Sequence, residues 1–216
     1  MDFLDEMRAE TKALREQVLG HPFVRGIGDG TLDAGRFRFY LGQDYAFLIE
    51  YARIVAIASA KSPDLATQAR FASLLDATLN VEMDLHRRVC AANGIGPDEL
   101  VATQPTLACA AYTQHLLSVA WTGTLGELCA SLVPCQHGYA EIASSLAPAT
   151  RPDNSYADWI VAYASPEYQE LAEWICDLTD RLASEATEPE REAMRRAYVD
   201  SAVHELAFWD MAWAAF

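Results

Sequence analysis

Residues 132–141 read LVPCQHGYAE and lie within a longer segment, about 125–146, whose apolar periodicity predicts one helix. Pro134 falls in the middle of that helix, where a proline removes a backbone donor and clashes with the preceding turn, at a cost of roughly 3 kcal/mol. Cys135 follows, and Tyr139 lies four residues further on, hence on the same face. A bent helix with a thiol and a phenol on one face predicts an opening toward a ligand. A buried core Cys and Tyr would give the same pattern.

The composition is that of a folded globular chain. Its 216 residues are enough to bury a substantial core, and 51% of them are hydrophobic. No apolar run approaches the ~20 residues that cross a bilayer. The first six residues carry acids where a signal peptide would carry bases. We therefore expect a soluble protein that lies in the cytoplasm and does not bind membranes.

The charge balance is strongly acidic, with 31 Asp and Glu against 16 Lys and Arg and a formal net charge of −15. Such a field repels nucleic acid and anionic lipid, so we expect neither as a partner. The chain has 5 cysteines and no CxxC pair. An odd number of cysteines without that spacing indicates neither a disulfide framework nor a zinc site.

Helical periodicity recurs along the chain, and no strand-like alternation of useful length is present. Residues 21–32 are expected to form glycine-rich turns and residues 94–106 a loop. The sequence predicts seven or eight helices in one domain over residues 1–216, and Thr124 with Glu127 predicts a capping box. The helices are expected at about 3–19, 34–60, 64–92, 107–121, 125–146, 156–163, 166–184 and 189–214.

Several polar residues stand on otherwise apolar helix faces, as in helical bundles that build a site from side chains on different helices. Asp44 shares a face with Tyr40 and Tyr51, so its carboxylate must be paired or functional, because an isolated buried charge is costly. Glu205 precedes a run of aromatic residues, which favours its burial. The set comprises Asp44, Cys135, Tyr139, Tyr163 and Glu205.

Two groups of residues are candidate metal ligands. They are the pair Glu82 and His86 at i, i+4 and the adjacent His204 and Glu205. Di-iron bundles use Glu-x-x-His at i, i+3 on two helices, and this spacing does not occur in the sequence. We therefore expect no metal site. Glu82 and His86 keep no assigned role.

Six short motifs, taken together and in order, resemble the TenA/thiaminase II family along essentially the whole chain. They are HPFV at 21–24, DGTL at 29–32, FxxYLxQDY at 37–45, CxxxYA at 135–140, WIxxYxS at 159–165 and HExxFW at 204–209. The resemblance implies an all-α bundle of the haem-oxygenase-like type, assembled as a homotetramer. It also implies hydrolysis of thiamine, or of its degradation product aminopyrimidine, to hydroxymethylpyrimidine in thiamine salvage.

The resemblance also implies roles for seven residues and requires neither a metal nor an organic cofactor. Because the chain keeps its cysteine, it is similar to the cysteine branch of the family rather than to the branch with a glutamate elsewhere. The implied roles are nucleophile for Cys135, acid/base for Glu205, holder of the pyrimidine amino group for Asp44, phenols near the thiol and glutamate for Tyr139 and Tyr163, and aromatic walls for Phe47 and Tyr112.

Two other functions stay open at this point. One is a metal-dependent oxidase or oxygenase on the same fold, which bound iron or manganese would identify. The other is a non-catalytic helical protein that binds a pyrimidine or regulates a partner. Such a protein would bind its ligand without turnover and would tolerate loss of Cys135.

Overall fold

The computed structural model describes residues 2–151 and 153–215, with the side chains of Val81 and Leu85 left aside. Within these residues all the regular secondary structure is helical, which confirms the all-α prediction. The helices are α1 (Phe3–Glu10), α2 (Lys12–Leu19), α3 (Pro22–Asp29), α4 (Ala34–Lys61), α5 (Leu65–Ala77), the π-helix η1 (Thr78–Glu82), α6 (Met83–Ala92), α7 (Pro97–Ala102), α8 (Leu107–Thr122), α9 (Leu125–Leu146), the 3₁₀-helix η2 (Ala147–Ala149), α10 (Ala157–Tyr163), α11 (Pro166–Glu185) and α12 (Glu188–Ala214).

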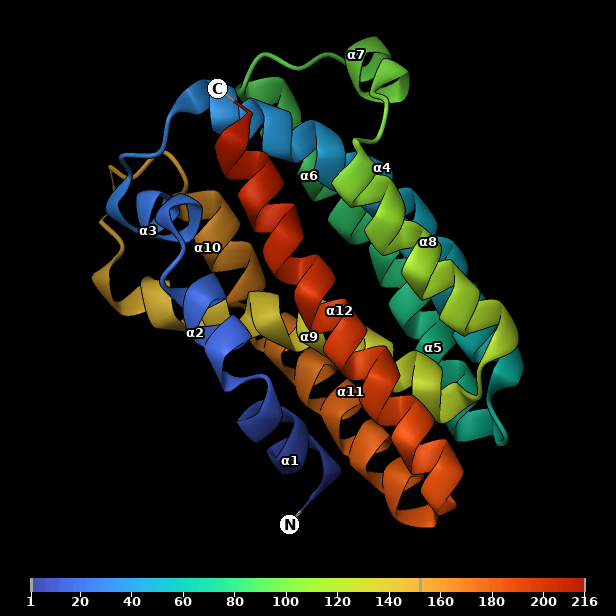
Figure 1. Cartoon of the computed structure of the whole chain (residues 1–216). Helices are drawn as coiled ribbons and strands as arrows, with labels where there is room; N and C mark the ends of the chain where they lie inside the picture. The colour runs from blue at the N-terminus through green and yellow to red at the C-terminus, as the bar shows by residue number, and fades with distance from the viewer. Residues whose placement is uncertain (1, 152, 216) are drawn as a thin grey trace.

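The helix α9 is the centre of the bundle. It packs against α4, α8, α10, α11 and α12, and Figure 1 shows the long α12 running across it. Its start is the predicted capping box, in which Thr124 Oγ1 accepts from the Glu127 amide at 3.2 Å while Glu127 accepts from the Thr124 amide at 2.9 Å. The helix continues through Pro134 without ending. The central segment of the sequence is therefore also the central element of the fold.

The prediction of glycine-rich turns over residues 21–32 is wrong, because α3 occupies Pro22–Asp29. His21 caps this helix through a 3.2 Å contact from the Phe23 amide to its Nδ1, and the helix ends at Gly30 in the left-handed region at φ 73°. Gly28 serves close packing rather than a turn, since an added Cβ would lie 2.6 Å from Leu146.

The chain contains more helices than the seven or eight predicted, with twelve α-helices in its described part. The expected helix at 3–19 divides at Thr11 into α1 and α2, and the Thr11 hydroxyl donates to the Met7 carbonyl at 2.8 Å. The expected loop at 94–106 contains the short α7, and the helix at 64–92 is interrupted by η1. Short helices of this kind carry too little periodicity to be read from sequence.

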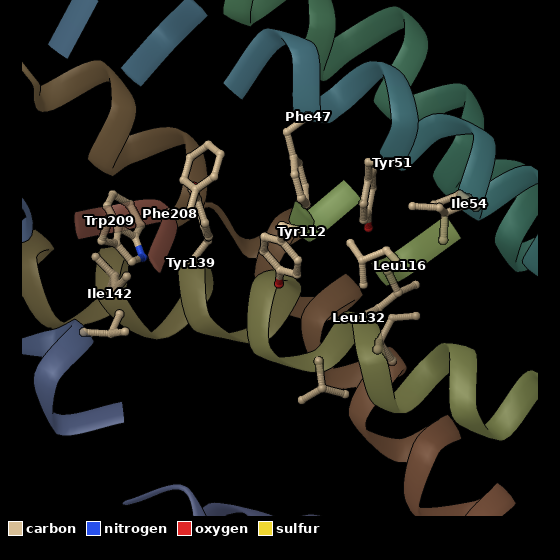
Figure 2. Packing of buried hydrophobic residues seen from close by; sticks show 14 of the residues in the cluster. Phe47, Tyr51, Ile54, Tyr112, Leu116, Leu132, Tyr139, Ile142, Phe208 and Trp209 are labelled. Carbon is tan, nitrogen blue, oxygen red and sulfur yellow. The ribbon is translucent and has the colours of Figure 1, made fainter. Parts of the chain in front are cut away.

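An aromatic core fills the space between α4, α8, α9 and α12. The Tyr40 and Trp209 rings stack at 5.6 Å, and Phe23 packs against both. Figure 2 shows Phe47 and Tyr51 pointing from α4 toward α9, with Tyr112 of α8 beside them. Offset and tilted rings of this kind add about 0.5–1.5 kcal/mol per pair to the burial of their area. The aromatic core therefore holds the helices that carry the polar residues in fixed positions. No helix in the described ranges has the length and apolar character to cross a membrane.

Candidate active site

A small cavity of about 20 Å³ lies between α4, η1, α9, α10 and α11, and we call it the inner cavity. It brings together five of the seven residues predicted as site residues: Asp44, Phe47, Cys135, Tyr139 and Tyr163. The rest of its wall is formed by Leu48, Tyr51, Glu82, Gln136 and Tyr168. These ten residues come from segments up to 124 positions apart (44 to 168), so only the folded chain assembles them.

The other two predicted residues lie behind this wall. Tyr112 packs on Phe47, with 5.2 Å between the two ring centres, and both are drawn in Figure 2. Glu205 lines a separate cavity of about 60 Å³ on the far side of α9, together with Pro134, His137 and others. Burial, followed by the charge of Glu205, raises the pKa of Cys135.

The surroundings of Cys135 favour the protonated form of its thiol. Its residue is half-buried, and burial together with the charges of Glu205, Asp44 and Glu82 raises its pKa well above the ordinary value. A thiolate is the nucleophilic form of cysteine. The site therefore needs a neighbouring base that takes the thiol proton when a substrate is bound.

Glu205 is a buried carboxyl that can play this part. Only 5% of it is exposed, and its Oε1 accepts a hydrogen bond from Trp209 Nε1 at 3.0 Å. Burial raises its pKa to about 8, against the contacts from Tyr112 and Trp209, which favour the ionised form. A carboxyl that titrates near neutral pH is suited both to accept a proton and to return it.

Asp44 is paired, as the sequence requires of a carboxylate on an apolar stripe. His86 Nε2 lies 3.3 Å from Asp44 Oδ2, and on the other side of the ring His86 Nδ1 lies 3.4 Å from the Cys90 sulfur. Burial lowers the pKa of His86, but the contacts with Asp44 and Cys90 outweigh it and raise that pKa to about 10. The raised pKa favours the charged form of His86, which lies as a counter-charge beside the Asp44 carboxyl.

Aromatic residues and their hydroxyl groups fix the shape of the inner cavity. Tyr139 contacts the rings of Tyr163 at 5.0 Å and of Trp159 at 5.8 Å, and its hydroxyl accepts from Tyr40 at 3.3 Å. On the opposite side, Tyr51 donates to Gln136 Oε1 at 2.5 Å. These contacts fix the aromatic rings that line the inner cavity and leave only about 20 Å³ between them.

A larger cavity of about 260 Å³ adjoins the inner one, and we call it the outer cavity. Four residues line both cavities and form the partition between them: Asp44, Glu82, Tyr163 and Tyr168. The remaining wall of the outer cavity is mostly apolar, with Leu41, Leu74, Trp159 and Leu171 among its members. Burial and the charge of Asp44 raise the pKa of Glu82 to about 7, against the opposing effects of His86 and Tyr163.

Glu82, His86 and Tyr168 line the two cavities and are not among the site residues predicted from the sequence. The i, i+4 spacing of Glu82 and His86 puts both on one helix face, which was the available signal. Tyr51 lies seven residues after Asp44 on the same apolar helix face, so its place near Asp44 could be predicted from this spacing. Tyr168 carries no local signal, because α11 reaches the cavity only through the packing of the bundle.

No cluster of three or more His, Cys, Asp or Glu side chains with metal-binding geometry occurs among residues 2–151 and 153–215. The expectation that the protein works without a metal stays a prediction. The groups that do converge here are a thiol, carboxyls and phenols. This set is equipped for nucleophilic addition and proton transfer.

Comparison with known proteins gives the relationship of the chain. Residues 8–215 match the TENA/THI-4/PQQC family. Over 215 residues the sequence is 40% identical to the aminopyrimidine aminohydrolase of Halalkalibacterium halodurans. The aligned region covers 99% of this chain and 96% of that protein. A crystal structure described as a TenA family transcription regulator from Silicibacter sp. TM1040 superposes with a TM-score of 0.92 and 31% identity, covering 98% of this chain and 96% of that one.

The fold extends beyond close relatives. Heme oxygenase-1 from the cyanobacterium Synechocystis sp. PCC6803 superposes with a TM-score of 0.66 at 14% identity, covering 97% of this chain and 91% of that chain. That similarity confirms the haem-oxygenase-like fold expected from the sequence. At 14% identity it shows the fold and nothing about function. The match over residues 8–215 shows family membership: the chain belongs to the TENA/THI-4/PQQC family.

Proposed function

We propose that this protein hydrolyses aminopyrimidine (4-amino-5-aminomethyl-2-methylpyrimidine) to hydroxymethylpyrimidine and ammonia, and thiamine to hydroxymethylpyrimidine and its thiazole, in thiamine salvage. The observation that carries the proposal is that Cys135 and the paired carboxylate Asp44 line one small aromatic cavity. The proposal is supported by 40% identity, over nearly the whole chain, to a protein named aminopyrimidine aminohydrolase.

Binding of the pyrimidine rests on Asp44 and the aromatic walls. The Asp44 carboxylate accepts a hydrogen bond from the exocyclic amino group of the ring, and its geometry is fixed by the His86 contact at 3.3 Å. Phe47, Tyr139 and Tyr163 are the aromatic walls that would face the two sides of the ring, and these walls must move apart to admit it, because the inner cavity of about 20 Å³ has room on the order of one water. A hydrogen bond to a charged group contributes about 1.5–3 kcal/mol, so Asp44 supplies a large part of the orientation.

The chemistry proceeds by addition and elimination. Glu205 takes the proton of the Cys135 thiol, the thiolate adds to a carbon of the pyrimidine ring, and Glu205 passes the proton to the ring nitrogen on which charge appears. The bond between the exocyclic methylene and the leaving nitrogen then breaks, and its electron pair goes to that nitrogen. Water adds at the methylene and gives up one proton to the solvent. The proton on the ring nitrogen then returns through Glu205 to the Cys135 sulfur as that sulfur is expelled and the ring regains aromaticity. The sum is aminopyrimidine plus water giving hydroxymethylpyrimidine plus ammonia.

Assembly and location form part of the proposal. We propose a homotetramer. The helices α8 and α12 pack side by side and expose the apolar side chains of Leu107, Trp121 and Val203, and exposed apolar surface of this kind marks protein–protein contacts. A cytoplasmic location is supported by the five cysteines, which are all free. Light scattering on the purified chain gives the mass of the assembly, and a monomer would contradict the tetramer.

The test is to incubate the purified protein with aminopyrimidine and, separately, with thiamine, and to separate the products by chromatography. We expect hydroxymethylpyrimidine from both, at a rate unchanged by exhaustive chelation. Turnover that is lost on chelation and restored by iron or manganese would instead indicate the oxidase or oxygenase alternative. Pyrimidine binding without any turnover would indicate a binding or regulatory protein.

A further inference from the structure

Two cavities of very different size share the partition formed by Asp44, Glu82, Tyr163 and Tyr168. The inner cavity, at about 20 Å³, adjoins Cys135, whereas the outer cavity has about 260 Å³. If the pyrimidine ring lies between Cys135 and Asp44, the substituent on its exocyclic methylene reaches the outer cavity past the partition. A departing ammonia would need only a small part of that volume.

The two carboxyl groups of the partition differ in their counter-charges. Asp44 has the imidazolium of His86 at 3.3 Å. Glu82 makes no ion pair within 4.0 Å inside the described ranges of the chain. The partition therefore carries one balanced and one unbalanced carboxyl, and the unbalanced one lies in the wall of both cavities.

The local backbone places Glu82 there. Thr78–Glu82 is a π-helical turn between α5 and α6, and π-bulges inside α-helices occur frequently at functional sites. Its first residue, Thr78, also lines the outer cavity and is only 1% exposed. The Thr78 hydroxyl has no hydrogen-bond partner among residues 2–151 and 153–215. A buried hydroxyl without a partner is costly, which indicates that a polar group of a ligand completes it.

The remaining wall of the outer cavity is suited to an organic cation. Trp159 adds an aromatic surface to those of Tyr163 and Tyr168 in the partition, and Leu74 and Leu171 contribute aliphatic ones. The charged groups of this wall are His86, whose charge Asp44 offsets at 3.3 Å, and the carboxyl of Glu167. Aromatic faces attract ammonium and other organic cations by about 0.5–2 kcal/mol. A carboxyl at one end and aromatic and aliphatic walls around it match an amine or azolium that carries an apolar substituent.

We propose that the outer cavity holds the group that leaves the pyrimidine and that Glu82 binds its positive charge, so that N-alkyl aminopyrimidines are substrates beside aminopyrimidine and thiamine. This inference rests on the proposed function. The leaving nitrogen enters with its positive charge, and the Glu82 carboxylate accepts a hydrogen bond from it or faces it. When the carbon–nitrogen bond breaks, the electron pair goes to nitrogen, which leaves as a neutral amine or thiazole, while Glu82 neither gains nor loses a proton.

The test compares two ligands that share the ring and differ at one group. Aminopyrimidine carries an ammonium where hydroxymethylpyrimidine carries a hydroxyl. Both dissociation constants are measured by calorimetry at pH 8.5 in a Cys135→Ser background, where turnover does not deplete the amine. We expect Glu82→Gln to reduce the preference for the amine over the alcohol at least ~10-fold and to leave alcohol binding within ~3-fold, because a charged hydrogen bond of about 1.5–3 kcal/mol is lost only for the amine.

Asp84→Asn is the matched control. Asp84 is two residues further on, is exposed, and pairs with Arg87 at 2.7 Å, so its substitution removes the same charge outside the cavities. We expect it to leave the preference unchanged and Glu82→Asp to restore part of it. An unchanged preference in Glu82→Gln would overturn the proposal, and so would an equal loss for both ligands, which would indicate a purely structural role.

Steric filling of the outer cavity gives an independent readout. Ala77 lines the outer cavity and not the inner one. We expect Ala77→Phe to lower kcat/KM for N-alkyl aminopyrimidines at least ~10-fold while hydroxymethylpyrimidine still binds, and equal losses for aminopyrimidine and its N-alkyl derivatives would overturn the leaving-group assignment. Failure of the wild-type chain to hydrolyse any of these pyrimidines contradicts the proposed function itself, and the two results are thereby distinguished.

Discussion

His86 Nε2 lies 3.3 Å from Asp44 Oδ2, and the two side chains are only 5% and 6% exposed. The pair joins α6 to α4, and Asp44 lines both cavities whereas His86 lines the outer one. It explains how a carboxylate is kept on an aromatic helix face at acceptable cost, since a buried charge is retained only when it is paired.

Removing His86 should therefore destabilise the protein. We expect His86→Gln to lower the free energy of unfolding by about 3–5 kcal/mol, the usual cost of leaving one member of a buried ion pair unpaired. Urea denaturation measures the change. The double variant His86→Gln with Asp44→Asn should recover part of the loss. A single variant with wild-type stability would show that the pair is not an ionic one.

Asp44 should act mainly in binding. An interaction that is equal in the ground and transition states changes KM and leaves kcat unchanged. We expect Asp44→Asn to weaken aminopyrimidine binding by about 1–3 kcal/mol, the range for a lost hydrogen bond to a charged group. Calorimetry gives the affinity and single-turnover kinetics give the rate. A variant that binds normally but does not react would reverse the role assigned to Asp44.

Glu205 should act mainly in proton transfer. We expect Glu205→Gln to lower kcat by ~10²–10⁴, the usual contribution of general acid–base catalysis, with a smaller change in binding. Glutamine keeps the shape and can still accept from Trp209 Nε1, which donates to Glu205 at 3.0 Å. Rapid-quench rates measure the effect. A change confined to affinity would show that Glu205 only holds the substrate.

The pH profile follows from the two raised pKa values. Burial raises the pKa of Glu205 to about 8 and, with the charge of Glu205, that of Cys135 well above its ordinary value. Below pH 8 both groups are protonated, and the pair has one proton too many for Glu205 to accept the thiol proton. We expect kcat/KM to rise through about pH 8 and to fall only at a pH well above 9, where the thiol itself ionises.

Two variants identify this rise with Glu205. It should disappear in Glu205→Gln and persist in Glu82→Gln, where the other raised carboxyl, with a pKa of about 7, is removed. Initial rates from pH 6 to 10, with the ionic strength held constant, give the profile. A kcat/KM that decreases through pH 8 would mean that Glu205 starts the reaction in its protonated form.

The residues that sequence could identify are those that violate the local pattern. Asp44 and Glu205 are charged residues on apolar helix faces, and Cys135 adjoins a proline within a helix, so each departs from what packing alone requires. The family motifs then supplied their roles. The long helices were predictable for the related reason that periodicity accumulates over many residues, as in α4, α9 and α12.

The remainder depended on tertiary contacts. Gly28 of α3 permits the close approach of that helix to Leu146 at the end of α9, whereas from sequence the same glycine indicates a turn. Nothing local in α6 shows that His86 meets Asp44, 42 positions away along the chain (86 minus 44). The outer cavity likewise exists only because α5, η1, α10 and α11 surround it.

The proposed hydrolysis depends above all on the thiol of Cys135. The most direct test of this dependence is the rate of hydroxymethylpyrimidine formation from aminopyrimidine by Cys135→Ser, with the affinity for hydroxymethylpyrimidine measured on the same sample. We predict a loss of at least ~10² in turnover with affinity unchanged within ~3-fold, because a serine hydroxyl lacks thiolate character while the cavity is preserved. Turnover near that of the wild-type chain would contradict the covalent mechanism.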